Sequence, residues 1–396
     1  YIILLKVTSL YKIKFINHAC MMIEDEKHAI LVDPWFTGKV FNDSWSLLRD
    51  TDLSLINFDK LSHIFISHEH PDHLHWATLK KIQEYSNKQI FVVSIKRENK
   101  NIKEAVQKIG FKHAELLAGR RTKITDRLWV SQFPTGHDSA FVFEADDKVI
   151  LNQNDCKLSR EQCFLIKQKY KKIDLWLMQF GLAGYYANSN DKQGLKDAKQ
   201  KHINLINTYY DFFKPSCFVP FASYVYFCKK YNYFLNEWQV TPAEISERCV
   251  MPTQFVFYGD EILYENYESR NDENIIKWSD TYDSKKEILA PKKIDNVEII
   301  KAFKNFTFGN DYSVPEKFYI ELFDNDKIFL CDLKNKNYNF IHTSEKAIVR
   351  TSMEELLCFV KYPWGADTLN ITSCFDMLDK QKFKNVLMWK DSLYKR

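Results

Sequence analysis

Short apolar runs separated by polar loops fill the first part of the sequence. Short β-rich apolar runs are typical of buried strands, whereas apolar positions at helical spacing indicate a helix. The runs predict strands at residues 13–16, 19–23, 29–32, 63–67, 90–94, 114–117, 129–133, 140–144, 149–152 and 175–180. The helical spacing predicts helices at residues 74–85, 102–109 and 194–213. Strands that alternate with helices and hairpins favour an α/β sandwich, which we assign to residues 1–267.

The pattern changes after this region. Residues 268–286 are polar and rich in Asn, Asp, Ser and Lys, which predicts a linker. Further strands are predicted at residues 318–322, 328–333, 339–341 and 347–350. Ser352 precedes the apolar segment 353–360 and has the side chain to cap a helix there, with two glutamates in the first turn. We therefore predict a small α+β C-terminal domain at residues 287–396.

Composition narrows the class of protein. Hydrophobic residues make up 45% of the 396 residues and charged residues 27%, which excludes collagen-like and largely disordered chains. The net charge of +4 is small and scattered, so no nucleic-acid partner is expected. No apolar run is long enough for a membrane span. The nine widely spaced cysteines contain no CxxC pair, which predicts reduced thiols and a cytoplasmic location.

The strongest chemical signal is the segment Ser-His-Glu-His-Pro-Asp-His, which follows a predicted strand directly. Imidazole and carboxylate groups are ligands that suit zinc or iron. His68 and His70 are two residues apart, so an extended chain places them on the same side. Pro71 then bends the backbone, and Asp72 and His73 can face a second ion. The alternative is a polar helix N-terminus with solvated histidines.

Further ligands are expected where other strands end. His137 follows a strand and the flexible Gly136, and Asp155 follows the strand at 149–152 and could bridge two ions through its two oxygens. Taken singly, either could equally be an ordinary loop residue. Asp33 ends its strand and could accept a hydrogen bond from a ligand imidazole, or form an Asx turn.

The other histidines carry weaker signals. His75 could approach the pocket, but a place on the helix surface is favoured. The remaining histidines have no ligand-like neighbours and are interpreted as structural or surface residues: His18, His28, His63, His113, His202 and His342. Trp35 and Trp45 lie in an aromatic loop that could wall a substrate site, although Trp45 could equally pack in the core. Tyr185 lies in a glycine-rich segment that suggests a mobile substrate loop or a plain surface turn.

The candidate ligands resemble the metal-binding motifs of the metallo-β-lactamase fold superfamily: His68, His70, Asp72, His73, His137 and Asp155. Residues 11–260 also resemble the catalytic domain of CMP-N-acetylneuraminate hydroxylase. This similarity rests on residues 31–35, 45–48, 67–74, 78–81, 150–152, 155–156 and 219–222 with Tyr224. The superfamily resemblance implies an αββα sandwich that holds two divalent metal ions, Fe or Zn, between its sheets. Asp72, His73 and Asp155 are then the expected catalytic residues, and Tyr224 joins Trp35, Trp45 and Tyr185 as an expected substrate contact.

The narrower resemblance implies a di-iron oxygenase that hydroxylates a sugar or nucleotide-sugar substrate. Two features depart from that family. The paired CxH and CxxH motifs of a Rieske cluster are absent, so an external electron donor or upstream residues would supply electrons. Phe227 and Lys229 stand where the family has a Glu and a His. If either of those is a ligand, Asp72, His73 and Asp155 alone would hold the second ion.

Two other functions stay open from the sequence. The first is a metal-dependent hydrolase that uses a metal-activated water, since one scaffold hosts both chemistries. The second is a metal-binding scaffold subunit without turnover. The expected partners are a small-molecule substrate and, in addition, a redox protein or a second copy of this chain. Residues 351–366 weakly resemble a sterol-carrier-like module, and the C-terminal domain could equally serve as a lid or an interface.

Overall fold

Two β-sheets pack face to face in the computed structural model, which describes residues 11–95, 102–136, 138–284, 286–306 and 314–394. The first sheet has the strand order β16-β1-β2-β3-β6-β7-β8. Its strands are β1 (Lys12–Asn17), β2 (Cys20–Glu24), β3 (Ala29–Val32), β6 (Leu61–Phe65), β7 (Phe91–Ile95), β8 (Lys112–Leu116) and β16 (Glu261–Ile262). The second sheet has the order β14-β13-β12-β11-β10-β9. Its strands are β9 (Thr122–Lys123), β10 (Leu128–Thr135), β11 (Asp138–Ala145), β12 (Lys148–Asn154), β13 (Leu175–Gln179) and β14 (Cys217–Phe221).

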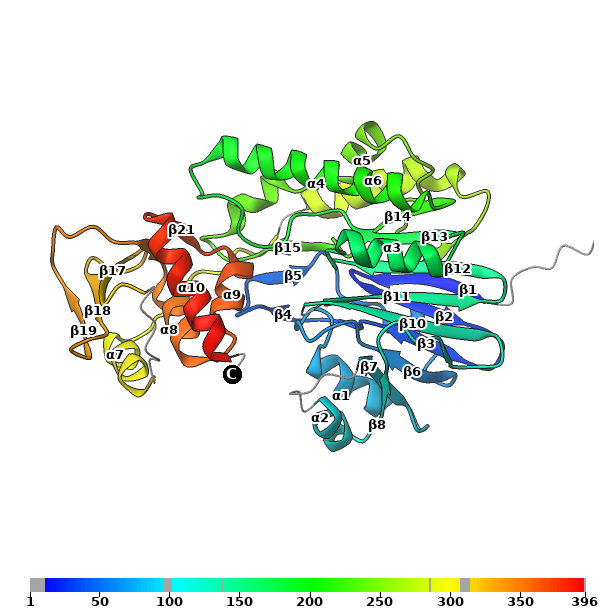
Figure 1. Cartoon of the computed structure of the whole chain (residues 1–396), viewed down its shortest axis with the longest axis horizontal. Coiled ribbons are helices and arrows are strands. Elements are labelled where there is room, and N and C mark those ends of the chain that lie inside the picture. Colours follow the sequence, from blue (N-terminus) through cyan, green and yellow to red (C-terminus); the bar gives the residue numbers. More distant parts are fainter. Residues whose placement is uncertain (1–10, 96–101, 137, 285, 307–313, 395–396) are drawn as a thin grey trace, which may run out of the picture.

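Helices cover the outer faces of both sheets (Figure 1). Helices α1 (Trp76–Tyr85) and α2 (Ile102–Ile109) lie against the first sheet, where Leu79, Ile82 and Val106 share a buried cluster with its strands. Four helices lie over the second sheet: α3 (Arg160–Lys169), α4 (Lys192–Phe213), α5 (Pro242–Arg248) and α6 (Asn271–Asp283). The predicted αββα sandwich is confirmed.

The main core fills the space between the two sheets and continues between the second sheet and the helices that cover it. Phe65 of the first sheet meets Phe141 and Phe143 of the second, with ring centroids 5.7 and 5.5 Å apart. Strands β3 and β6 are parallel, so their carboxyl ends meet at the same edge of the sheet. Burial of the apolar side chains on one face fixes the register of each strand. The polar residues that follow β3 and β6 consequently lie together at one end of the sandwich.

A small three-stranded sheet connects this sandwich to the C-terminal part of the chain. It has the order β15-β5-β4 and consists of β4 (Lys39–Val40), β5 (Trp45–Leu47) and β15 (Val225–Phe227). In Figure 1 it lies between the sandwich and the orange and red elements of the C-terminal domain.

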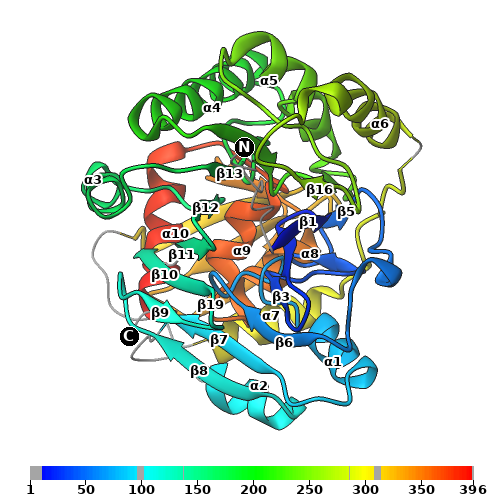
Figure 2. The same cartoon turned by 90° about the vertical axis from the view of Figure 1, so that its right-hand side faces the viewer.

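The C-terminal domain has a sheet and a core of its own. The sheet has the order β19-β18-β17-β20-β21, with β17 (Lys317–Leu322), β18 (Ile328–Asp332), β19 (Asn337–Ile341), β20 (Val349–Thr351) and β21 (Phe375–Met377). Its helices are α7 (Asn296–Asn305), α8 (Met353–Lys361), α9 (Gly365–Thr372) and α10 (Lys380–Tyr394). The Ser352 side chain accepts a hydrogen bond from the Glu355 amide, which confirms the predicted helix cap. Seen along the sandwich in Figure 2, α8, α9 and α10 lie behind the β-sheets.

The predicted linker at residues 268–286 is wrong. This segment contains the short helix η3 (Glu268–Arg270) and the thirteen-residue helix α6. Trp278 is buried with the main core, and Ile275 and Tyr282 pack against it. These residues follow helical spacing, but the polar residues between them hid the apolar stripe in the sequence.

None of the helices in the described part of the chain is both long and apolar enough to cross a membrane. All nine cysteine side chains are buried. Burial raises the pKa of the Cys163 thiol to about 11, which keeps that thiol protonated near neutral pH.

Candidate metal centre

Histidine and aspartate side chains converge at the end of the sandwich where the strands of both sheets stop. His68, His70 and Asp155 form one group, and their ligand atoms all lie within 4.8 Å of one another. His18, Asp72 and His73 form a second group by the same measure. The five histidine and aspartate residues that the sequence predicted and the structure describes are thus brought together, joined by His18.

Asp155 links the two groups. Its Oδ2 atom lies 3.7 Å from His68 Nε2 in the first group and 3.5 Å from His73 Nε2 in the second. In the first group, His68 Nε2 is 2.8 Å from His70 Nδ1. In the second, Asp72 Oδ2 is 3.4 Å from both His73 Nε2 and His18 Nε2. A carboxylate placed in this way could bridge two cations.

Asp33 fixes the position of the loop that carries Ser67 and His73. It follows β3 with a positive φ of 45° and is fully buried. Its carboxylate accepts hydrogen bonds from the Ser67 amide (2.7 Å) and hydroxyl (2.6 Å), and it lies 2.9 Å from His73 Nδ1. A proton on Nδ1 would be donated to Asp33, which leaves His73 Nε2 with its lone pair toward Asp72 and Asp155.

Several candidate ligand atoms of the cluster are buried without a hydrogen-bond partner. These atoms are Asp72 Oδ1, His73 Nε2 and Asp155 Oδ1. A buried polar atom without a partner is costly, and native structures seldom retain one without a reason. Carboxylate oxygens and imidazole nitrogens in this proportion are the donors that zinc and non-haem iron take. The residues present therefore fit divalent metal ions.

Burial and neighbouring charges shift the pKa values of the histidines in the cluster. Burial lowers the pKa of His68 well below its ordinary value, which leaves the imidazole neutral and able to bind a metal. Burial alone would lower the pKa of His73 too, but the nearby carboxylates, Asp72 foremost, raise it well above its ordinary value. A cation in the second group would take the place of this imidazole proton, because metal and proton compete for the same lone pair.

Comparison with known proteins agrees with this arrangement. Residues 12–171 match the model of the beta-lactamase superfamily domain, in the Lactamase_B_3 family. The chain carries a metallo-β-lactamase superfamily domain. This confirms the superfamily that the histidine and aspartate motifs predicted.

More distant similarities extend beyond that domain. The chain is 22% identical over 255 residues to the cytidine monophosphate-N-acetylneuraminic acid hydroxylase of Danio rerio, covering 59% of this chain and 42% of that protein. It therefore spans about two fifths of that curated relative. Among solved structures, it is similar to CmlA, a diiron beta-hydroxylase from Streptomyces venezuelae (TM-score 0.45, 12% identity, 65% of this chain and 54% of that one). It is also similar to Igni18, a metallo hydrolase from Ignicoccus hospitalis (TM-score 0.43, 17% identity, 64% and 97%).

His18 is a candidate ligand that the sequence interpretation missed. It was assigned a structural or surface role, whereas it is 1% exposed and its Nε2 atom faces Asp72. Its position could have identified it as a candidate. His18 directly follows β1, just as Asp33 follows β3 and Asp155 follows β12. Asp138 was also overlooked, and its carboxylate lies 3.8 Å from His68 Nε2.

Two other histidines of the metallo-β-lactamase domain were considered in the sequence. His137 lies outside the described residues, so its predicted role as a ligand stays a prediction. The adjacent Gly136 has a φ of +54° and makes the predicted turn between β10 and β11. His75 is half-buried rather than on the helix surface, because it caps α1: its Nδ1 atom accepts a hydrogen bond from the Thr78 amide.

Aromatic side chains form a wall beside the histidine cluster, and Trp35 is part of it. The Trp35 ring is 5.7 Å from that of His18, and its indole N–H donates to the Thr37 carbonyl at 3.0 Å. Trp45 packs on Phe41 at 5.0 Å, and Phe41 lies 5.7 Å from His70. Trp45 therefore supports the wall from behind, and its predicted contact with substrate stays a prediction.

The two tyrosines predicted to bind substrate have partners within the fold. The Tyr224 side chain is buried, packs 4.5 Å from the Phe15 ring and donates its hydroxyl hydrogen to the Val256 carbonyl. Tyr185 stacks on Phe375 of the C-terminal domain, with ring centroids 4.5 Å apart. No described contact joins either tyrosine to the histidine cluster, so their predicted role in substrate binding stays untested.

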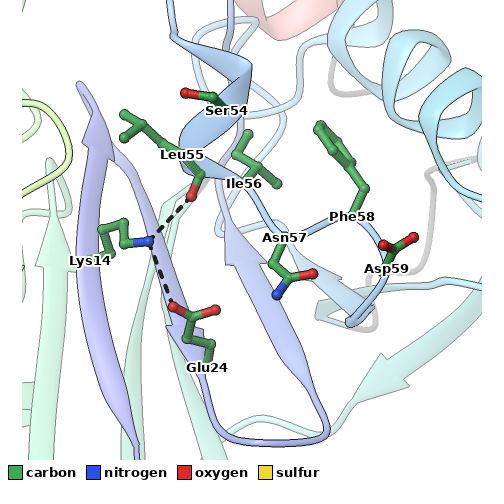
Figure 3. A pocket seen from close by; sticks show the side chains of 8 residues that line it. All are labelled: Lys14, Glu24, Ser54, Leu55, Ile56, Asn57, Phe58 and Asp59. Atoms are coloured by element: carbon green, nitrogen blue, oxygen red, sulfur yellow. Dashed lines mark hydrogen bonds and ion pairs between the residues drawn. The ribbon is translucent and has the colours of Figure 1, made fainter.

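A surface pocket of about 410 Å³ lies elsewhere on the metallo-β-lactamase domain (Figure 3). Residues 54–59 line it together with Lys14 and Glu24. The Lys14 ammonium group points across it, 3.6 Å from the Glu24 carboxylate and 3.4 Å from the Leu55 carbonyl. Its lining includes no member of the two candidate metal-binding groups.

Proposed function

We propose that this chain is a metal-dependent enzyme with a dinuclear centre. The observation that carries the proposal is the pair of histidine and carboxylate groups that share Asp155. His68, His70 and Asp155 would hold the first ion, with His137 as a further ligand. Asp72, His73 and His18 would hold the second, with Asp155 between the two. Such ions supply Lewis acidity and, when they are iron, redox chemistry.

The protein's own residues would prepare this centre for reaction. Asp33 holds His73 through Nδ1, so that the Nε2 atom faces the pocket without reorganisation. Trp35 and Phe41 lie against the rings of His18 and His70, so aromatic side chains border the cluster there. Asp72, His73 and Asp155 are then the residues that face the reacting atoms and remain our candidates for catalysis.

We favour an oxygenase that hydroxylates a sugar or nucleotide-sugar substrate. Support comes from the similarity to the hydroxylase of Danio rerio, which extends over 59% of this chain and past the metallo-β-lactamase domain. The reaction would need a source of electrons, either a separate donor protein or residues upstream of Tyr1, since residues 1–396 have no paired CxH and CxxH motifs for a Rieske cluster.

That same feature of the sequence supports a second candidate, a metal-dependent hydrolase. Hydrolysis of a phosphodiester, lactone or amide transfers no electrons, so it needs no donor. The same pocket would hold two zinc ions and lower the pKa of a water between them.

Metal content separates these candidates. The protein is purified without chelators, its metals are measured per chain, and its visible absorbance is recorded. Iron with an absorbance band, together with reductant-dependent hydroxylation of a nucleotide sugar, would support the oxygenase. Zinc with hydrolysis of a phosphodiester or lactone would support the hydrolase. Fewer than one ion per chain under all loading conditions would overturn both and leave a scaffold subunit.

The second group makes a separate prediction. His18→Ala is expected to lower the metal content from two ions per chain to about one, because it removes the imidazole nitrogen opposite Asp72. Elemental analysis after zinc loading measures this. The matched control is His202→Ala, which removes another buried histidine, on α4, and should retain both ions. Two ions in the His18 variant would show that this residue is not a ligand.

A further inference from the structure

The C-terminal domain reaches the candidate metal centre through α9. Asp367, in the first turn of this helix, places its Oδ2 atom 3.1 Å from His70 Nε2. The two residues are 297 positions apart in the sequence. Both ring nitrogens of His70 therefore have a partner. Nδ1 faces His68 inside the cluster, and Nε2 faces Asp367 of the C-terminal domain.

Several contacts with the metallo-β-lactamase domain and its neighbouring loops hold α9 in this position. The Tyr185 amide donates to the Asn370 carbonyl at 2.9 Å, and the Asn232 side chain donates to the Thr372 carbonyl at 2.8 Å. Gly184 adopts a φ of +97°, and a Cβ atom there would lie only 3.3 Å from the Asn370 carbonyl oxygen. The loop and the helix thus fit closely, and the approach of Asp367 to His70 is built into the interface.

Two ion pairs hold the neighbouring helix α8 against the segment that carries Lys229. The Lys229 ammonium group lies 2.6 Å from the Glu355 carboxylate and 3.1 Å from that of Glu354. Ser189 donates its amide and hydroxyl hydrogens to Asp376, at 2.7 and 3.1 Å. The C-terminal domain is therefore tied to the metallo-β-lactamase domain at points on either side of α9, and Asp367 is carried on a fixed element.

A histidine that binds a metal through one ring nitrogen commonly donates the hydrogen on the other to a carboxylate. This contact selects the tautomer and fixes the plane of the ring. With the hydrogen of His70 on Nε2 and directed at Asp367, the lone pair of Nδ1 faces His68 and Asp155, where the first ion would be held. The remaining donors of that group come from the other domain, so the contact joins the two halves of the chain at the metal.

We propose that Asp367 is a positioning residue for His70, and that docking of the C-terminal domain thereby completes the surroundings of the first metal ion. The inference rests on the proposed dinuclear centre. It gives the C-terminal domain a defined part in metal binding through a single carboxylate.

The test uses the full chain and cobalt(II), whose visible spectrum reports the geometry of its ligands. Asp367→Ala and the isosteric Asp367→Asn are compared with Asp376→Asn, which removes a carboxylate from the same interface without touching a histidine. We expect both Asp367 variants to weaken cobalt binding by about 10–100-fold and to change the spectrum of the bound ion. Asp376→Asn should leave the affinity and the spectrum as in the wild type.

Three results would overturn the inference, and they can be told apart. If the wild type binds no cobalt, the proposed dinuclear centre fails and Asp367 has nothing to position. If the wild type binds cobalt and Asp367→Asn matches it in affinity and spectrum, only the role of Asp367 fails. If Asp376→Asn weakens binding as much as Asp367→Asn, the effect belongs to the interface as a whole.

Discussion

Replacing His68 or His70 by alanine is expected to remove the first metal ion and all activity that depends on it. His68 is 3% exposed, and its Nε2 atom lies 2.8 Å from His70 Nδ1 and 3.7 Å from Asp155 Oδ2. Loss of a residue that only hydrogen-bonds to a ligand lowers metal affinity about 10–100-fold. Loss of a ligand itself should cost more, because the ion then has an open position in a partly buried site.

Elemental analysis of the purified variants measures the effect, and activity is assayed on the same samples. The matched control is His75→Ala, which removes a histidine from the same loop. Its imidazole caps α1 by accepting a hydrogen bond from the Thr78 amide, so this variant should lose about 0.5–2 kcal/mol of stability and keep its metal. Unchanged metal content in both the His68 and the His70 variants would refute the ligand assignment.

Replacing Lys229 by methionine is expected to lower the free energy of unfolding by about 3–5 kcal/mol. Lys229 is 5% exposed and Glu355 is fully buried, and their charged groups lie 2.6 Å apart. Without the ammonium group, the Glu355 carboxylate keeps the Asn42 amide as a hydrogen-bond donor at 3.0 Å but loses its opposite charge. A buried charge without its partner is costly because it has been removed from water. Urea unfolding at neutral pH measures the change.

The loss should also depend on pH. Burial raises the pKa of Glu355 even with Lys229 present, and removing Lys229 takes away the group that opposes this rise. A carboxyl group with a raised pKa in the folded state binds a proton more tightly there than in the unfolded chain, so stability falls as the pH rises. The destabilisation by Lys229→Met should therefore be smaller at pH 5 than at pH 8.

Lys230→Met is the control for this variant, because the neighbouring lysine is exposed. A surface substitution of this kind should change stability by no more than about 0.5 kcal/mol. Replacing Lys229 and Glu355 together by methionine and leucine should recover part of the loss, since the buried Glu355 charge is then removed with its partner. Equal stability of the Lys229 variant and the wild type would show that Glu355 is neutralised in another way.

Local patterns predicted most of the strands but only four of the ten α-helices in the described part of the chain: α1, α2, α4 and α8. Helix α2 has the predicted bounds, and α8 begins at the predicted Met353 behind its Ser352 cap. These features depend on neighbours within a few residues, such as apolar spacing and capping hydrogen bonds, which the order of residues specifies. The helix α6 was missed because its apolar stripe is sparse and becomes meaningful only where Trp278 meets the main core.

The sequence by itself determined that a dense set of histidine and aspartate ligands follows one strand, and that Asp155 and Asp33 stand at the ends of others. These residues carry their signal within a single turn or at a strand end. Only the tertiary structure decided that His18 faces Asp72, that Asp367 meets His70, and that Lys229 pairs with Glu355. Each of these pairs joins segments far apart in the chain, where no periodicity or spacing links the partners. Their contacts arise from the closing of the sandwich and the docking of the C-terminal domain, which depend on burial across the whole molecule.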